Sequence, residues 1–223
     1  MREDDKEVAA LAALREVEAG MTVGLGTGTT AAYFVTHLAA RVRSGLAITA
    51  VATSRSTESA ARAAGIAVAA FEDMASVDLM VDGVDEIDDR LRAIKGAGGA
   101  MLREKIVAAA SRRMTVIADA SKWSTAIGRK AVPVEVLPFA REFVLAALRS
   151  LDAGPTLRMA DRRPAASDQG NLIVDCAFAA LPDPAATAAA LSAIPGILGH
   201  GLFLTEVDAA YIADGGVVTR YDR

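Results

Sequence analysis

Short apolar runs alternate with helical patterns along the first half of the chain, and this alternation constrains the fold more than any other feature. The apolar runs that predict strands cover residues 21–25, 47–52, 66–71 and 77–81. The helical patterns around them cover residues 4–19, 31–42 and 57–64. Such alternation is typical of βα units around a mostly parallel sheet. We therefore predict an α/β fold that binds its ligand at the carboxyl ends of the strands.

The pattern changes after Lys130. The predicted strands now cover residues 132–136, 156–159, 172–175 and 197–203, and the predicted helices cover residues 139–151 and 184–193. This β-α-β-β-α-β order fits a small ferredoxin-like sandwich. The last segment, residues 209–220, is strand-like with a Gly215-Gly216 turn, which would let it return to the first sheet. We expect a Rossmann-like, mostly parallel sheet domain at residues 1–129 and 205–223, and a smaller ferredoxin-like α+β domain at residues 130–204.

Composition excludes several classes of protein. Of the 223 residues 52% are hydrophobic and 23% are charged, which is the mix of a folded globular chain. The net charge of −4 makes nucleic acid an unexpected partner. The single cysteine, Cys176, fits a reducing compartment. Residues 1–6 lack the apolar core of a signal peptide, and no apolar run reaches the roughly 18 residues of a membrane span. We expect a cytoplasmic protein that does not bind membranes.

A glycine- and threonine-rich loop, Gly24–Thr30, follows the first predicted strand and leads into a helix. Its backbone N–H groups, the helix N-terminus and the threonine hydroxyls together favour a phosphate. The same residues match the dinucleotide pattern G-x-G-x-x-A. That pattern also needs an acidic residue about 20 positions later, and residues 21–57 contain no Asp or Glu. An NADP site using Arg55 and a simple tight turn remain as alternatives.

An acidic run, Asp82–Asp88, lies at the end of the fourth predicted strand. Crowded carboxyl groups cannot all ionise easily, so their pKa values separate, which suits acid–base chemistry. A solvated acidic loop and a magnesium site are the alternatives. With only His37, His200 and one cysteine available, a zinc site is not expected.

A second glycine-rich loop, Lys95–Ala100, leads into another predicted helix. Its N–H groups and the Lys95 ammonium would stabilise an oxyanion. On the helix, Leu102 and Ile106 form the expected apolar stripe, which places Glu104 on roughly the opposite side, free to face a site. The alternative for Glu104 is an ordinary first-turn residue favoured by the helix dipole.

Two further strand ends carry polar residues. Asp119–Lys122 follows the predicted strand 114–118. Lys122 would therefore reach the ligand site at the carboxyl ends of the strands, unless it is a plain surface lysine. The stretch 53–57 is rich in hydroxyl groups, which either donate to a ligand or cap a helix through Ser56 or Thr57.

Taken together and in order, these motifs resemble type A ribose-5-phosphate isomerase from about Gly20 to Phe203. The segments that carry the resemblance are Gly26–Thr30, Asp82–Asp88, Lys95–Ala100, Arg103–Ile106, Ala118–Lys122, Pro133–Ala140 and Ile194–Phe203. The sequence departs from the family pattern at Thr29, Val84, Ala97, Ser167 and Gln169. Only Ala97 raises a structural question, because it replaces a glycine that could need a positive φ.

The resemblance implies interconversion of ribose 5-phosphate and ribulose 5-phosphate in the pentose phosphate pathway, without a metal or cofactor, by a dimer or tetramer. Asp82 or Asp85 would move the ring-opening proton. Glu104, its pKa raised by its surroundings, would take the C2 proton, and Lys95 with its loop would stabilise the cis-enediolate. By family analogy, Thr27–Thr30 and Lys122 contact the phosphorylated substrate. The expected substrate-binding residues are Thr27, Gly28, Thr29, Thr30, Asp82, Gly83, Val84, Asp85, Lys95, Gly96, Ala97, Gly98 and Lys122.

Two rival functions belong to other classes. An NADP-dependent oxidoreductase would need a ribose-phosphate pocket near Arg55 and would bind NADPH tightly. A non-catalytic sugar-phosphate sensor would bind its ligand without turnover, and this class usually carries an attached partner domain.

Overall fold

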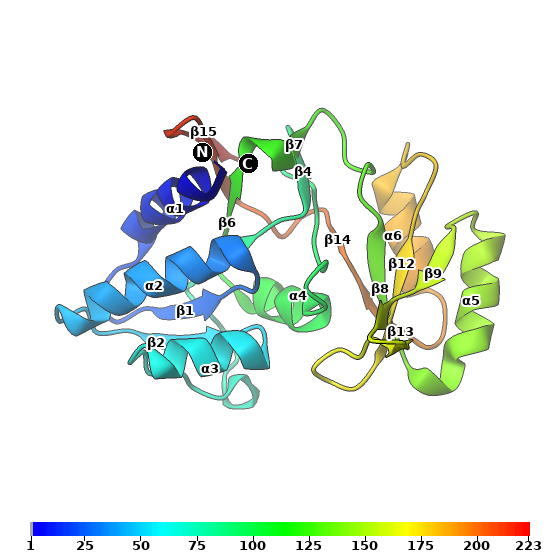
Figure 1. Ribbon diagram of the computed structural model, residues 1–223, viewed down its shortest axis with the longest axis horizontal. Coiled ribbons are helices and arrows are strands. Elements are labelled where there is room, and N and C mark those ends of the chain that lie inside the picture. The colour runs from blue at the N-terminus through cyan, green and yellow to red at the C-terminus, as the bar shows by residue number, and fades with distance from the viewer. Residues whose placement is uncertain (1) are drawn as a thin grey trace. The chain divides into compact units, whose positions relative to one another are not determined.

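The computed structural model describes residues 2–223, so Met1 of the first predicted domain range lies outside the described residues. The described chain groups into two compact units, whose elements are labelled in Figure 1. The first unit contains the residues up to Val84, together with Arg103–Trp123 and Thr205–Arg223. The second contains Asp85–Leu102 and Ser124–Leu204. The segment 85–102 thus groups with the second unit, whereas the predicted boundaries at 129/130 and 204/205 had kept it in the first domain.

The first unit is built on a mostly parallel sheet with the order β16-β15-β6-β3-β1-β2. All neighbouring pairs are parallel except β15 with β16, which form the hairpin that the Gly215-Gly216 turn predicts. The strands are β1 (Thr22–Leu25), β2 (Thr49–Ala52), β3 (Leu79–Gly83), β6 (Met114–Asp119), β15 (Ala209–Asp214) and β16 (Val217–Asp222). The predicted return of the C-terminal segment to the first sheet is confirmed.

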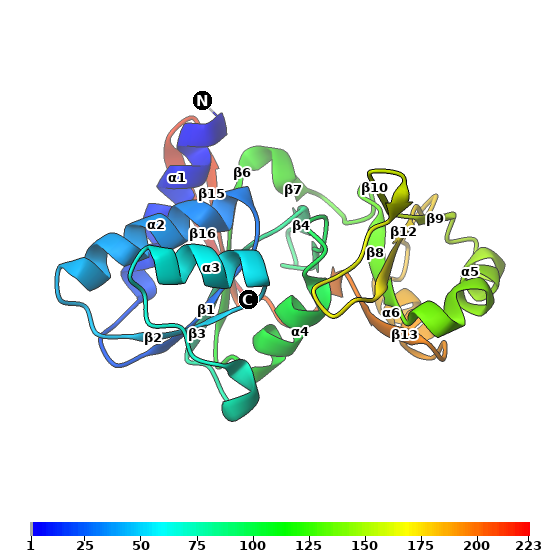
Figure 2. The same ribbon diagram turned by 60° about the horizontal axis from the view of Figure 1, so that its bottom comes forward.

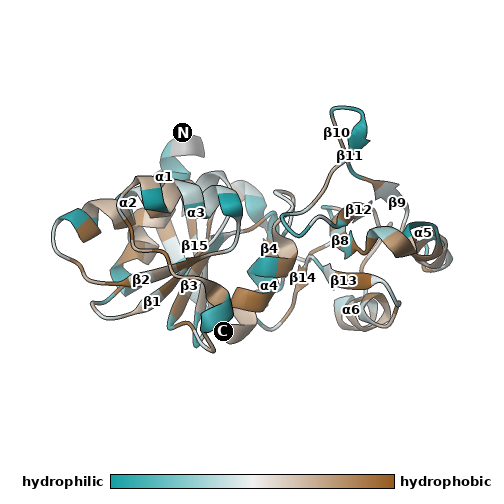
Figure 3. Cartoon of the chain, turned by 90° about the horizontal axis from the view of Figure 1, so that it is seen from below, coloured by the Kyte–Doolittle hydropathy of each residue, from teal (hydrophilic) through white to brown (hydrophobic). Residues whose placement is uncertain are grey.

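Helices cover both faces of this sheet. Figures 2 and 3 show α1 (Arg2–Ala13), α2 (Thr29–Arg43) and α3 (Arg55–Ala63) on one side of β1 and β3, and α4 (Met101–Ala110) on the other. Alternate side chains of each strand face opposite layers, so Val23 and Leu25 join the core that includes Phe34 of α2. No helix among residues 2–223 combines the length and the apolarity that crossing a bilayer requires.

The second unit contains an antiparallel sheet with the order β13-β8-β12-β9. Its elements are β8 (Val132–Val136), α5 (Arg141–Ser150), β9 (Pro155–Leu157), β12 (Leu172–Cys176), α6 (Pro184–Ser192) and β13 (Ile197–His200). This is the predicted β-α-β-β-α-β ferredoxin-like arrangement. Between β9 and β12 the hairpin β10 (Met159–Ala160) and β11 (Arg163–Pro164) is inserted.

A small separate sheet has the order β14-β5-β4-β7. Its strands are β4 (Glu86–Asp88), β5 (Ala93–Ile94), β7 (Trp123–Ser124) and β14 (Leu202–Phe203). The predicted single strand 197–203 is therefore wrong, because it divides between two sheets at Gly201. A Cβ at Gly201 would lie 2.2 Å from the carbonyl oxygen of Lys95, so only glycine allows this close crossing.

The predicted strand 66–71 is also wrong. Only an isolated bridge pairs Val68 with Ala50, and the segment ends in a 3₁₀ turn at Phe71–Asp73. Its apolar residues Ile66 and Val68 still join the core of the first unit. Burial, and not sheet pairing, explains why this short apolar run looks like a strand.

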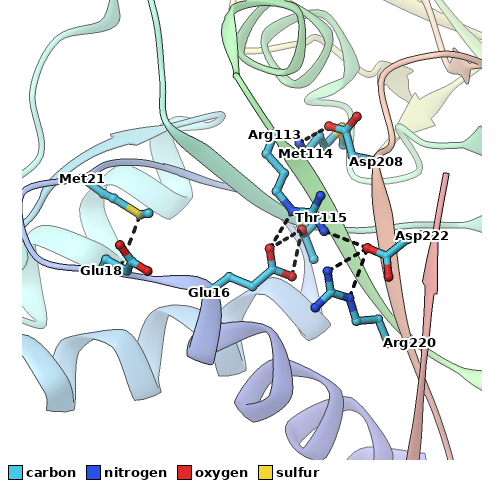
Figure 4. Close-up of polar contacts among 9 residues, drawn as sticks. All are labelled: Glu16, Glu18, Met21, Arg113, Met114, Thr115, Asp208, Arg220 and Asp222. Carbon is cyan, nitrogen blue, oxygen red and sulfur yellow. Dashed lines mark hydrogen bonds and ion pairs between the residues drawn. The ribbon is translucent and has the colours of Figure 1, made fainter.

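Ion pairs join the C-terminal strand, β16, to the rest of the first unit (Figure 4). Arg113 Nε lies 2.7 Å from Glu16 Oε2, and Arg113 Nη2 lies 3.0 Å from Asp222 Oδ1. Hydrogen bonds from Arg220 and Arg113 hold the pKa of Asp222 below its usual value. Arg113 precedes β6 and Asp222 ends β16, so this cluster lies at the amino end of β6, opposite the edge where the sequence motifs gather.

Candidate functional site

The parallel strands of the first unit all end at one edge, and the sequence motifs follow these ends. Strand β1 leads into the Gly26–Thr30 loop and β2 into Thr53, while β6 leads into the Ala120–Lys122 turn. Asp82 is the next-to-last residue of β3, so it lies inside the strand and not beyond it as predicted. The carboxyl edge of this sheet is therefore the candidate site in the first unit.

Asp82 is fully buried and fixes the neighbouring loop. Its Oδ1 accepts hydrogen bonds from the N–H groups of Thr27, at 3.0 Å, and Gly83, at 2.7 Å. A Cβ added to Gly26 would lie 2.1 Å from this same oxygen. Gly26 is glycine because the Asp82 carboxylate occupies the space of a side chain.

The Thr27 hydroxyl belongs to a cluster of hydroxyl groups. It donates to Ser54 Oγ at 2.9 Å and lies 2.9 Å from Thr53 Oγ1 and 3.3 Å from Thr57 Oγ1. Thr57 in turn donates to the carbonyl of Gly26 at 3.0 Å. The predicted cap of the following helix is corrected, since Ser54, and not Ser56 or Thr57, accepts the capping N–H of α3. This cluster holds the loop in place through Thr27.

The next residues form the N-terminus of α2. Gly28, with a φ of +113°, is its N-cap, and Gly28 and Thr29 are exposed while Thr30 is 9% exposed. The first N–H groups of a helix have no partner within it, so this fifteen-residue helix presents donors and a positive dipole end. These are the features that favour an anion.

Two lysines lie near Asp119, and one of them, Lys6, also contacts this helix end. Lys6 Nζ donates to Thr29 Oγ1 at 3.4 Å. Burial opposes ionisation of Asp119, but hydrogen bonds from Ser121 and the charges of Lys122 and Lys6 hold the pKa of Asp119 below its usual value. Lys122 was predicted here. Lys6 was not, because one lysine in an acidic helix start carries no sequence signal that distinguishes it from a surface residue.

Glu104 is 3% exposed, and the reason differs from the predicted one. The expected stripe of Leu102 and Ile106 is wrong, since Ile106 is 46% exposed while Val107 is buried. Val107 packs toward the sheet, with its Cγ1 3.0 Å from the Cβ position of Gly24. Glu104 lies three residues before Val107 and therefore shares its sheet-facing side. Met80 of β3 is also 3.2 Å from that position, so Asp82, two residues later, faces the same layer.

In the second unit the structure brings Asp85 together with the Lys95–Ala100 loop. Asp85 Oδ2 accepts the N–H of Ala97 at 2.9 Å. Lys95 is 2% exposed, and its Nζ lies 5.6 Å from the centroid of the Phe203 ring. Ala97 and Gly98 are exposed at the tip of the loop. Among the described residues Ala97 is not one of those with positive φ, so its replacement of a glycine requires no adjustment.

The other acidic residues of the run hold the fold. Glu86 accepts hydrogen bonds from Arg129 at 2.9 Å and from the N–H groups of Gly128 and Lys130, both at 3.0 Å. Asp88 pairs with Arg92. Within residues 2–223 no group of three or more His, Cys, Asp or Glu side chains is arranged to hold a metal ion. The solvated-loop alternative fails for Asp82, Glu86 and Asp88, which are all fully buried.

Replacement of Gly26 by alanine tests the contact with Asp82. The new Cβ would overlap a buried carboxylate that cannot retreat from its strand, so Gly26→Ala should lower the free energy of unfolding by about 1–3 kcal/mol. Urea unfolding followed by circular dichroism measures this change.

The matched control is Gly83→Ala, whose Cβ would meet only Thr30 Cβ at 3.8 Å, an ordinary contact. Its free energy of unfolding should stay near that of the wild type. A Gly26→Ala protein as stable as the wild type would contradict the proposed role of Asp82 in fixing this loop.

The chain is similar in sequence to known proteins. The sequence model of ribose 5-phosphate isomerase A (phosphoriboisomerase A) matches residues 49–216. Ribose-5-phosphate isomerase A of Sphingopyxis alaskensis is 52% identical over 214 residues, which cover 96% of this chain and 94% of that protein. The protein of the same name from Methanosarcina acetivorans is 46% identical over 218 residues, covering 96% and 92%.

Solved structures agree in fold over the whole chain. A D-ribose-5-phosphate isomerase in complex with phospho-erythronic acid matches with a TM-score of 0.96 and 32% identity, covering 100% of both chains. Ribose 5-phosphate isomerase A of Methanocaldococcus jannaschii matches with a TM-score of 0.94 and 32% identity over 99% of both chains. On these grounds the chain belongs to the ribose 5-phosphate isomerase A family.

Proposed function

We propose that this chain is an aldose–ketose isomerase that interconverts D-ribose 5-phosphate and D-ribulose 5-phosphate in the pentose phosphate pathway. Besides family membership, one observation carries the proposal. A buried carboxylate, Asp82, lies directly against a loop that opens an anion-binding helix end, and a second buried carboxyl group, Glu104, faces the same layer. A sugar phosphate needs both an anion site and groups that move protons.

The phosphate is proposed to bind at the N-terminus of α2. Gly28, Thr29 and Thr30 would supply N–H and hydroxyl donors, and Lys122 with Lys6 would supply positive charge. In this proposal Thr27 serves mainly to position the loop, because its N–H donates to Asp82 and its hydroxyl to Ser54.

The proton transfers are assigned to carboxyl groups. Ring opening moves a proton between the ring oxygen and O1, and Asp82 or Asp85 is proposed to carry it. Glu104 is proposed to remove the C2 proton and return it to C1, so that an enediolate forms between the two steps. A single carboxyl group can serve both steps, because the two carbons are adjacent.

The enediolate needs stabilisation of its two oxygens. Lys95 and the N–H groups of the Gly96–Gly98 segment are proposed to supply it, as preorganised donors that are in place before charge develops. Gly83 and Val84 complete the proposed substrate-binding residues. No step requires a metal or a nucleotide cofactor.

We further propose a cytoplasmic homodimer or homotetramer, without nucleic acid or membrane partners. Support for self-association comes from apolar side chains at the surface of the second unit. Phe139 is 97% exposed and Phe143, one helical turn later, is 58% exposed, with Leu137 at 41% before them. Exposed apolar groups that lie close together are typical of interaction surfaces.

The replacement Glu104→Gln tests the proposed base. The amide keeps the shape of the side chain but cannot accept the C2 proton, so turnover of ribose 5-phosphate in EDTA should fall by about 100-fold or more. Glu58→Gln is the matched control, because the ion pair that Glu58 makes within the described residues is with Arg62 of the same helix, α3. Its turnover should equal that of the wild type.

The outcomes separate the alternatives. If the folded wild type does not convert ribose 5-phosphate in EDTA, the metal-free isomerase proposal fails; binding without turnover would favour a sensor, and tight NADPH binding an oxidoreductase. If the wild type is active and Glu104→Gln is equally active, the isomerase stands and the base moves to Asp82 or Asp85.

The assembly is tested by light scattering after size-exclusion chromatography. The mass should be two or four times the 23.0 kDa of the chain. The paired replacement Phe139→Ser and Phe143→Ser should lower it by removing apolar contact area. A wild-type mass equal to one chain would contradict self-association.

A further inference from the structure

The Lys95–Ala100 loop of the second unit is held by hydrogen bonds from Arg158, which lies far from it in the sequence. Arg158 follows β9, and its guanidinium Nη1 donates to the carbonyl oxygens of Gly96, at 3.1 Å, and Ala97, at 2.9 Å. Neither the sequence motifs nor the proposed chemistry uses this residue. Its contacts nevertheless fall on the backbone of a segment that is proposed to bind the enediolate.

The other two nitrogens of the Arg158 guanidinium donate to Asp175. Nε donates to Asp175 Oδ2 at 2.8 Å, and Nη2 donates to Asp175 Oδ1. The Arg158 N–H also donates to the carbonyl of Ile173 at 2.8 Å, so both backbone and side chain are anchored to β12. A planar guanidinium paired in this two-point manner keeps one orientation, which a lysine ammonium would not.

The two hydrogen bonds from Arg158 determine the direction of the Ala97 and Gly98 N–H groups. The Gly99 N–H donates to the Gly96 carbonyl at 3.0 Å and closes a turn with Ala97 and Gly98 at its corners. In a trans peptide the carbonyl and the following N–H point in opposite directions. With the carbonyls of Gly96 and Ala97 toward Arg158, the N–H groups of Ala97 and Gly98 point away from it.

The Ala97 N–H is directed away from Arg158 in this way, and it donates to Asp85 Oδ2 at 2.9 Å. The next, that of Gly98, lies at the exposed tip of the turn. We propose that Arg158, fixed by Asp175, is a positioning residue that holds the Gly96–Gly99 turn so that the Gly98 N–H, next to the Ala97 N–H that Asp85 accepts, is aimed at the enediolate. This inference rests on the proposed isomerase function.

The test compares Arg158→Met, which keeps the length of the side chain but removes its donors, with the exposed control Arg163→Met. Removing a preorganised donor typically costs 10²–10³ in rate, and loosening one should cost less. We expect Arg158→Met to lower kcat for ribose 5-phosphate by roughly 10- to 100-fold, with KM changed by less than about threefold. Arg163→Met should match the wild type.

A second readout separates positioning from a merely structural role. Phospho-erythronic acid, which a related isomerase structure contains, carries a carboxylate whose two oxygens resemble those of an enediolate. Its inhibition constant should rise with the loss of kcat in Arg158→Met, because the loop donors contact the intermediate more closely than the substrate. Arg158→Lys should recover part of both losses. Asp175→Asn should cost much less in the Arg158→Met background than in the wild type.

The outcomes are distinct. If the wild type isomerises ribose 5-phosphate and folded Arg158→Met retains its kcat and its affinity for phospho-erythronic acid, the positioning role is wrong while the isomerase proposal stands. If the wild type itself neither turns over nor binds, the isomerase proposal fails and this inference fails with it. Should Arg158→Met not fold, Asp175→Asn carries the same comparison, since it releases the guanidinium from its anchor.

Discussion

The contact between the Asp82 carboxylate and the Gly26–Thr30 loop is the constraint on which the first unit's candidate site depends. One buried oxygen accepts the N–H groups of Thr27 and Gly83, so the end of β3 and the turn after β1 share a single anchor. The absence of a side chain at Gly26 makes room for it. From this anchor the chain enters α2, so the helix end proposed to bind the phosphate is fixed relative to the carboxyl group proposed to move a proton.

Several buried carboxyl groups hold the fold through hydrogen bonds, whereas Asp85 and Lys95 are proposed to act on the substrate. Glu86 and Asp88 receive several hydrogen bonds each and tie turns of the second unit together. Glu135, fully buried on β8, accepts from Ser167 at 2.6 Å and Asn171 at 2.8 Å. Buried carboxylates paired in this way act as structure. Asp85, in contrast, accepts the N–H of Ala97 in the exposed turn that follows Lys95 and whose backbone Arg158 holds.

Local patterns predicted most of this fold because apolar alternation, glycines and helix caps act over a few residues. The strand 132–136 and the two-part architecture follow from such patterns. The strand 66–71 did not form, because burial alone produces the same apolar run. The apolar stripe on α4 was misassigned, since Val107 and not Ile106 meets the sheet. Lys6 and Arg158 were missed because their roles depend on contacts with residues 23 and about 60 positions away, which no local pattern reports.

The central claim is that carboxyl groups move protons on a phosphopentose. Following the isomerisation of ribose 5-phosphate in D₂O by proton and deuterium NMR tests it most directly. A carboxyl base exchanges its proton with solvent while the enediolate exists, so deuterium should appear at C1 of ribulose 5-phosphate and at C2 of the recovered ribose 5-phosphate. Complete conversion without deuterium at either carbon would indicate direct hydride transfer between the two carbons and would contradict the account.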